Sequence, residues 1–431
     1  MFDSKETVLT HANNEQQVPP LLQEAVLYAQ QRSPFYKKLF EEHQLSFESG
    51  MFIAQFKQIP CIQKEDLQQH NFDFLCIPYE HIAEYTATTG THGKAVSIAL
   101  SNPDLERLAL NEAHSFQLME LNSSDRVQLM LTLDRQFMAG MAYYAGLRKS
   151  GIASVRCGPA LPLVQLETAL QLQTTVWIAV PSFILKVIDY AQQHQFDLSK
   201  LAVRKVLCIG ENIRDEQFAM NSLAKRITDA LPVQVYSTYA STEMQTAFTE
   251  CGSGCGGHYN EAMIYAEILD EEGNAVPEGS YGELVISTLG IEAMPLLRYR
   301  TGDVVRMHGE PCSCGRTSPR ISPVLGRKNQ MIKYKGTTLY PPLLHHVLHD
   351  FEGIIDYVVE ISKDNLDQDE VAMYVCVKEN LDTTSLKEFL KARLRFVPKL
   401  IFQTEQEIQT LLFKTGTRKA QRFIDVRKHV L

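Results

Sequence analysis

An alternation of helical and strand-like patterns between residues 96 and 209 constrains the fold most. Strand-type segments at residues 127–133, 176–180 and 206–209 are separated by stretches in which apolar residues recur at helical spacing. Strands that are each followed by a helix tend to pair in parallel, because the helix returns the chain to the edge at which the strand began. The sequence therefore predicts an α/β domain with a largely parallel sheet.

The pattern changes further along the chain. After residue 256 it becomes rich in strand-like segments, and beyond residue 327 helices expected at 343–351 and 386–394 alternate with strands. A chain of 431 residues is also too long for one simple core. We expect a large N-terminal domain at 1–326, with mainly parallel sheets and a β-rich subdomain, and a small mobile α+β domain at 327–431.

Composition excludes some classes of partner. The formal net charge of -9 and the absence of long basic runs argue against a nucleic-acid partner. Apolar runs are too short to span a bilayer, and residues 1–17 lack the layout of a signal peptide. We therefore expect a cytoplasmic protein without a membrane partner.

Four of the nine cysteines are clustered in two short segments. Cys251, Cys255 and His258 form the first group, and Cys312 and Cys314 form the second. In a reducing compartment such clusters favour a metal over disulfides. Cys251, His258, Cys312 and Cys314 would make a closed four-coordinate zinc site and leave Cys255 over. Free thiols on glycine-rich loops are the alternative.

A loop at residues 86–94 combines hydroxyls, glycines and a lysine before a strand. Thr88, Thr89, Gly90, Thr91 and Lys94 can offer backbone N–H groups, hydroxyls and an ammonium to phosphate oxygens. The glycine spacing is not that of a Walker loop. An ordinary polar loop is the alternative reading.

Two carboxylates stand at predicted strand ends. Glu243 follows the predicted strand at 233–236, where a carboxylate can hold Mg²⁺ beside phosphates, and the nearby Tyr239 can stack on a base. Asp303 is expected on a Thr-Gly-Asp turn between two strands, where it can accept hydrogen bonds from ribose hydroxyls. A solvated turn carboxylate is the alternative for each. No Gly-x-Ser-x-Gly elbow supports hydrolase chemistry.

These segments occur in the order found in the adenylate-forming superfamily. Within it the chain resembles the phenylacetate–CoA ligase family over nearly its whole length, most specifically at residues 294–303. The other similar segments are the phosphate loop at 89–94, the adenine and Mg–ATP segments at 210–211 and 239–243, the zinc elements at 250–258 and 312–317, the hinge at 326–336, and the lysine segment at 418–422.

The resemblance implies a reaction in two steps. ATP and a carboxylic acid give an acyl adenylate and pyrophosphate, and coenzyme A then attacks to give a thioester. Lys419 and Glu243 would be catalytic, because fixed cations stabilise charge that develops on phosphate oxygens. The residues implied in nucleotide or coenzyme A binding are Thr88, Thr89, Gly90, Thr91, Lys94, Gly210, Glu211, Tyr239, Ala240, Ser241, Thr242, Asp303, Arg327, Lys335 and Gly336.

By the same resemblance the cofactors are ATP, Mg²⁺, coenzyme A and a structural Zn²⁺, and the acid is expected to be aromatic. A homodimer stays open. Two alternatives also stay open: an adenylating enzyme that passes the acyl group to a carrier protein or another nucleophile, and a nucleotide-binding protein without turnover. His92, Ala240 and Asn329, which depart from the family pattern, favour the second.

Overall fold

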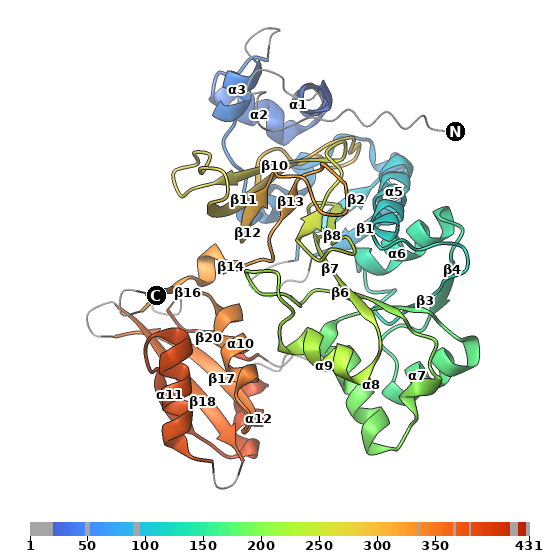
Figure 1. The fold of residues 1–431 in the computed structure, drawn as a ribbon. Helices are drawn as coiled ribbons and strands as arrows, with labels where there is room; N and C mark the ends of the chain where they lie inside the picture. The colour runs from blue at the N-terminus through green and yellow to red at the C-terminus, as the bar shows by residue number, and fades with distance from the viewer. Residues whose placement is uncertain are drawn as a thin grey trace. The chain divides into compact units, whose positions relative to one another are not determined.

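The computed structural model describes residues 20–47, 52–88, 95–334, 337–364, 368–378, 381–413 and 421–427. The chain divides into two compact units (Figure 1). Unit 1 contains Met1–Thr301 and Val305–Pro323, and unit 2 contains Gly302–Val304 and Val324–Leu431. The division of function between domains at 1–326 and 327–431 stays a prediction.

Unit 1 begins with short helices. They are α1 (Pro20–Arg32), α2 (Pro34–Glu42), α3 (Phe52–Gln58) and α4 (Lys64–His70), with 3-10 turns at Asn71–Phe74 and Tyr79–His81. The first two helices are separate because Ser33 caps α2 and Pro34 occupies its first turn. The buried Tyr36 of α2 accepts a hydrogen bond from the backbone N–H of Leu297 at 2.8 Å, which ties these helices to the segment at 294–303.

A long mixed sheet forms the framework of unit 1. Its strands run in the order β10-β11-β12-β13-β9-β8-β7-β6-β5-β3-β4. The parallel part contains β3 (Arg126–Leu129), β4 (Ala153–Arg156), β5 (Val176–Ala179), β6 (Lys205–Ile209) and β7 (Gln234–Ser241). The other strands are β8 (Thr246–Glu250), β9 (Gly257–His258), β10 (Ile264–Leu269), β11 (Tyr281–Thr288), β12 (Tyr299–His308) and β13 (Arg320–Ile321), and β1 (Glu84–Ala87) and β2 (Ser97–Leu100) form a separate antiparallel pair. The predicted α/β fold is confirmed, with antiparallel strands extending the parallel part.

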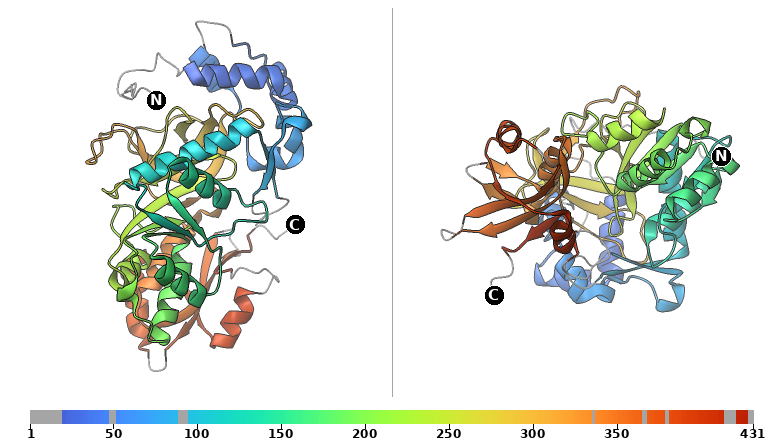
Figure 2. Two further views of the ribbon diagram at one scale, coloured as in Figure 1. Left: turned by 90° about the vertical axis from the view of Figure 1, so that its right-hand side faces the viewer. Right: turned by 90° about the horizontal axis from the view of Figure 1, so that it is seen from below.

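Helices cover both faces of the parallel part (Figure 2). They are α5 (Asn102–Leu118) and α6 (Met138–Lys149) on one face, and α7 (Pro162–Leu172), α8 (Pro181–Gln193) and α9 (Ser222–Ala230) on the other. In β5, Val176 and Ile178 pack in the same core as residues of α5 and α6, whereas Trp177 and Ala179 pack with α7, α8 and α9. Side chains alternate across a strand, so an all-apolar run such as β5 is buried on both faces.

Unit 2 is a smaller α+β unit. Its elements are β14 (Gly326–Arg327), a 3-10 turn at Lys328–Gln330, β15 (Ile332–Tyr334), β16 (Thr337–Leu339), α10 (Pro341–Asp350), β17 (Ile354–Lys363), β18 (Asp369–Val377), α11 (Thr383–Leu394), β19 (Lys399–Phe402), α12 (Glu405–Leu412) and β20 (Phe423–Asp425). The main sheet has the order β19-β18-β17-β20. Val359 of β17 packs in the core that includes Leu344 of α10 and Leu386 of α11, and Val358 packs with Ile408 of α12.

No helix in the described part of the chain combines the length and the apolar composition needed to cross a bilayer.

Candidate active site and metal centre

The hairpin of β7 and β8 carries several of the predicted nucleotide-binding residues. Tyr239, Ala240 and Ser241 were expected to follow the predicted strand at 233–236, but β7 continues through Ser241 because β8 pairs with it. Only Thr242 and Glu243 of the predicted segment lie in the turn. Strand β7 ends later than the sequence pattern indicates. Its end is determined by pairing with β8 and not by the spacing of its apolar residues.

Glu243 is held in this turn by two polar side chains from elsewhere in unit 1. Its side chain is 9% exposed, and its Oε1 lies 3.6 Å from Nζ of Lys64. The hydroxyl of Tyr299 donates to the same oxygen at 3.4 Å. Both contacts are long, so the carboxylate is oriented without being tightly bound. Such a carboxylate can accept a divalent cation at the end of a strand.

Arg107 of α5 holds the β7–β8 hairpin and the segments next to it through hydrogen bonds. This buried guanidinium donates to the carbonyl of Gln245 at 2.7 Å, to the hydroxyl of Thr246 at 3.1 Å and to the carbonyl of Leu289 at 2.8 Å, and also to the carbonyl of Met263. Burial lowers the pKa of Arg107 to about 10. The sequence analysis missed this residue, for which the available signal was an arginine among the apolar residues of a helix.

Gly210 and Glu211 follow β6, which pairs in parallel with β7. Glu211 accepts hydrogen bonds from the backbone N–H and the hydroxyl of Ser182, at 2.9 and 2.8 Å, at the start of α8. Gly210 has a φ of +73°, which glycine adopts without strain. Since Ile209 is the register partner of Thr238, the segments 210–211 and 239–243 meet at the carboxyl edge of the parallel strands. Ligands of open α/β sheets bind at this edge.

Thr88 closes the base of the predicted phosphate loop. Its N–H donates to the carbonyl of Val96 at 2.9 Å, and its buried hydroxyl accepts from the N–H of Val96 at 3.1 Å. Thr89, Gly90, Thr91 and Lys94 lie outside the described residues, as do Lys335, Gly336 and Lys419.

Asp303 lies within β12 and not on the predicted turn. It is the register partner of Arg327 in β14, and Nε of Arg327 lies 3.4 Å from its Oδ1. Gly302, with a φ of +76°, introduces the local irregularity that the Thr-Gly-Asp sequence indicates, but the strand continues through it. Asp303 and Arg327, both expected to bind nucleotide or coenzyme A, are thus neighbours within unit 2.

The structure brings the four predicted metal ligands together. Cys251 follows β8, His258 ends β9, and Cys312 and Cys314 lie in the loop between β12 and β13. Their ligand atoms all lie within 4.8 Å of one another. The strands account for this, because β9 pairs with β8 on one side and with β13 on the other.

The distances within this cluster fit a tetrahedral metal. Sγ of Cys251 lies 3.7 Å from Sγ of Cys312, and Sγ of Cys314 lies 3.7 Å from Nε2 of His258. Zinc–sulfur bonds of about 2.3 Å in a tetrahedron place two sulfur atoms about 3.8 Å apart. Cys255 is not part of the group, and its thiol points to the carbonyl of Ser253 at 3.2 Å.

The surroundings of His258 and Cys314 favour the protonation states in which these side chains bind a metal, the neutral imidazole and the thiolate. Nδ1 of His258 lies 2.8 Å from the hydroxyl of Ser318, a contact that fixes the ring. Burial, together with Arg320, lowers the pKa of His258 to about 4, so the imidazole is neutral. Burial acts to raise the pKa of the Cys314 thiol, but hydrogen bonds from Arg316, together with those from Cys312 and Cys251, lower this pKa to about 7.

Comparison with known proteins identifies the family. The AMP-binding enzyme family model matches residues 4–293, which is more than half of the chain. The phenylacetate-coenzyme A ligase of Thermus thermophilus is 26% identical over 83% of this chain and 80% of its own length. The corresponding enzyme of Aromatoleum evansii is 25% identical over 79% of this chain and 76% of its own.

A solved structure of 2-hydroxyisobutyryl-CoA ligase in the postadenylation state has the same fold, with a TM-score of 0.81 at 19% identity over 97% of this chain and 95% of that one. The chain therefore belongs to the AMP-binding enzyme family and is an adenylate-forming, acyl-CoA ligase-like enzyme of the AMP-forming acid–thiol ligase class.

Proposed function

We propose that this protein joins a carboxylic acid to coenzyme A at the expense of ATP. The acid carboxylate attacks the α-phosphorus of ATP and pyrophosphate leaves, which gives the acyl adenylate. The coenzyme A thiol then attacks the acyl carbon, and AMP leaves. The observation that carries the proposal is the meeting of residues 210–211 and 239–243 at one sheet edge, with Glu243 oriented there by Lys64 and Tyr299.

The nucleotide roles follow from the chemistry of the side chains. Tyr239 offers an aromatic face for adenine, and Thr242 offers a hydroxyl for phosphate oxygens. The Asp303 carboxylate can accept from both ribose hydroxyls while Arg327 holds it in place. Mg²⁺ would be held by Glu243 and would neutralise charge on the leaving pyrophosphate.

The remaining assignments rest on the family resemblance. Lys419 would stabilise charge on the α-phosphate during adenylation, and Lys335 and Gly336 would lie along the path of the pantetheine arm. The second step would require a different face of the small domain, with a pivot at residues 327–329.

The Cys₃His cluster is assigned as a structural zinc site. Four protein ligands would leave no open coordination position for a substrate, which is the pattern of structural and not catalytic zinc. Cys251, His258, Cys312 and Cys314 would hold the ion, and Ser318 would orient the histidine.

A panel of acids tests the function. Purified protein with ATP and Mg²⁺ is given phenylacetate, other aromatic acids and short aliphatic acids, and pyrophosphate release is measured with and without coenzyme A. We expect acid-dependent release, thioester formation with free coenzyme A, and the highest kcat/KM for an aromatic acid. Adenylate without a coenzyme A thioester would favour transfer to a carrier protein. ATP binding without pyrophosphate release for any acid would favour a protein without turnover.

Lys419→Ala separates the two steps. We expect adenylation to fall by about 10³-fold, since a cation at the developing charge is lost. Thioester formation from supplied acyl adenylate should stay within about twofold of wild type, because the lost contact acts only in the adenylation step. Lys391→Ala, on α11, is the matched control. Equal loss of both steps would contradict the role of Lys419.

A further inference from the structure

A buried ion pair joins the metal centre to the segment that begins at the adenine motif. We call residues 210–221 the nucleotide loop and residues 251–258 the metal loop. We propose that the Arg214–Glu250 pair connects the metal centre to the nucleotide loop and that a bound metal thereby stabilises this loop. Metal binding would then strengthen ATP binding. The ATP part of this inference rests on the proposed function.

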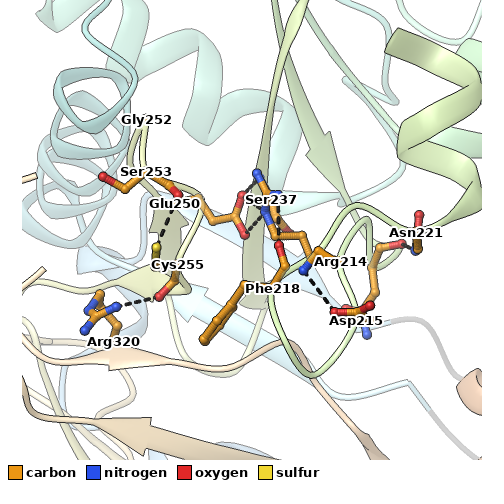
Figure 3. A network of polar contacts seen from close by, with 12 residues as sticks. Arg214, Asp215, Phe218, Asn221, Ser237, Glu250, Gly252, Ser253, Cys255 and Arg320 are labelled. Atoms are coloured by element: carbon orange, nitrogen blue, oxygen red, sulfur yellow. Dashed lines mark hydrogen bonds and ion pairs between the residues drawn. The ribbon is translucent and has the colours of Figure 1, made fainter. Parts of the chain in front are cut away.

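The pair is tightly bound (Figure 3). Nε of Arg214 donates to both oxygens of Glu250, at 2.8 and 2.9 Å, and the two side chains are 13% and 3% exposed. The backbone N–H of Ser237 in β7 donates to Oε2 of Glu250 at 3.1 Å. Glu250 directly precedes the metal ligand Cys251. A buried ion pair is strongly destabilised when one partner moves away, because the other charge is left without compensation.

The metal loop also contacts the guanidinium group through its backbone. A Cβ atom at Gly254 would lie 2.4 Å from Nη2 of Arg214, so any side chain at this position would collide with the arginine. Gly254 donates its N–H to the carbonyl of Cys251 at 3.0 Å and has a φ of +62°. The turn that receives Arg214 is therefore the turn that Cys251 begins.

The nucleotide loop is cross-linked by hydrogen bonds around Arg214. Nη1 of Arg214 donates to the carbonyl of Phe218 at 3.2 Å, and Asp215 accepts from the N–H of Ala219 at 2.9 Å. The N–H of Asn221 donates to the carbonyl of Ile213 at 3.0 Å. A displacement of Arg214 would thus affect Phe218 directly, and the side chain of Asn221, which donates to the carbonyl of Asn212 at 2.8 Å, connects the end of the loop to the residues that follow the sheet edge.

Other contacts join the metal loop to the neighbouring strands. Nη1 of Arg320, in β13, donates to the carbonyl of Cys255 at 2.7 Å, and the side chain of Gln234 donates to the carbonyl of Gly252 at 3.3 Å. These contacts fix the metal loop on the sheet. Arg214 extends from the nucleotide loop to Glu250 beside the metal loop (Figure 3), and a Cβ atom at Gly256 would lie 3.3 Å from Cε1 of Phe218, so the described residues of the two loops also meet there.

Hydrogen exchange tests the coupling without any substrate. Wild-type protein is measured as purified, after removal of metal with a chelator, and after addition of zinc alone. We expect faster exchange in both 251–258 and 210–221 after metal removal, and recovery of both with zinc. Faster exchange confined to 251–258 would overturn the inference, and so would a protein that binds no zinc.

Glu250→Gln tests the ion pair itself. It removes the charge and keeps the size of the side chain, and we expect KM for ATP to rise roughly tenfold, in the range of ordinary coupling between sites. The KM for coenzyme A and the zinc content should not change. Asp125→Asn is the control, because Asp125 is also buried and paired with an arginine, Arg204 at 2.6 Å, at the opposite edge of the same strands. An equal rise of KM for ATP in both variants would reduce Glu250 to a general stabilising role and overturn the inference.

A double variant completes the test. Cys312→Ser should raise KM for ATP in the same direction, and Cys312→Ser with Glu250→Gln should raise it by less than the product of the single effects, since both act through the same contact. If KM for ATP in the double variant rises by the full product of the two single effects, the two changes act independently and the coupling is overturned. If Glu250→Gln does not fold, Arg214→Lys takes its place. Wild type without any ligase activity would overturn the proposed function alone, because the exchange measurement would still decide the coupling of the two loops.

Discussion

Two buried glutamates lie at opposite ends of β8 and differ in how they are held. Glu250, at the end of the strand, is 3% exposed and bound by Arg214 at 2.8 and 2.9 Å. Glu243, in the turn before the strand, has contacts of 3.4 and 3.6 Å with Tyr299 and Lys64. A tight charge-assisted pair holds structure, whereas long contacts leave a carboxylate able to take a cation. This difference supports the structural role proposed for Glu250 and the chemical role proposed for Glu243.

The largest effect that would break this comparison concerns Glu243. Glu243→Gln should lower kcat/KM for pyrophosphate release by about 10³-fold, because a charge that places Mg²⁺ is lost. Its free energy of unfolding should change by less than about 1 kcal/mol, since the contacts it loses are weak. Activity assays and urea unfolding measure the two effects, with the exposed Glu271→Gln as control. A large loss of stability with retained activity would place Glu243 in the same class as Glu250.

The metal centre beside Glu250 should contribute stability and not chemistry. Cys312→Ser should remove the bound zinc and lower the free energy of unfolding by about 3 kcal/mol, as the loss of a metal commonly does. Metal analysis and thermal unfolding check this. Cys255→Ser is the matched control, because Cys255 lies outside the four-ligand group. Unchanged zinc content in Cys312→Ser would contradict the ligand assignment.

A third buried glutamate beside β8 sharpens the comparison through pH. Glu112 of α5 is 5% exposed, its Oε1 accepts from Asn111 at 2.9 Å, and burial raises its pKa from 4.5 to about 7. Between these pH values the folded protein binds a proton at Glu112 that the unfolded chain releases. This group therefore lowers the stability as pH rises from about 4.5 to 7, by up to roughly 3 kcal/mol.

Glu112→Gln should remove this dependence, because glutamine does not titrate. Urea unfolding at pH 5 and pH 8 measures it, and the variant should gain roughly 2 kcal/mol relative to wild type at the higher pH. Glu120→Gln, at an exposed position after α5, is the control. An unchanged difference between the two pH values would show that Glu112 is ionised in the folded protein.

The smallest effect is expected at Arg327. Its pair with Asp303 spans 3.4 Å and its side chain is 56% exposed, whereas the side chain of Arg214 is 13% exposed. Arg327→Gln should change the free energy of unfolding by only about 0.5 kcal/mol, since solvent screens such pairs. KM for ATP should rise by a few-fold, roughly 3- to 5-fold, as the loss of one orienting contact does. A loss of stability as large as that from breaking the Arg214–Glu250 pair would contradict this distinction.

Periodic segments of the chain were predictable from the sequence. The strands predicted at 176–180 and 206–209 match β5 and β6 to within one residue, and the helix predicted at 386–394 lies within α11. The order of the motifs was also sufficient to identify the family. These features are local, because apolar spacing and capping residues act within a few positions of one another.

The ligand set of the metal centre was predictable in part for the same reason. Cys251, His258, Cys312 and Cys314 stand in short segments whose residue types limit the chemistry, so the choice among five candidates could be made before the geometry was known. How they meet depends on β9 and β13, which have two residues each and therefore carry no periodic pattern. Only the pairing of β13 with β9 and of β9 with β8 could decide it.

What the sequence by itself determined is thus the class of fold, the family and the residue types that carry the chemistry. The tertiary structure alone decided that Tyr239 and Asp303 lie in strands, since β8 and β14 extend β7 and β12 by pairing with them. It also decided the roles of Arg107 and Arg214, whose partners lie 138 and 36 residues away in the chain. An arginine has the same local pattern whether it is solvated or buried, and only the folded chain brings its partner to it.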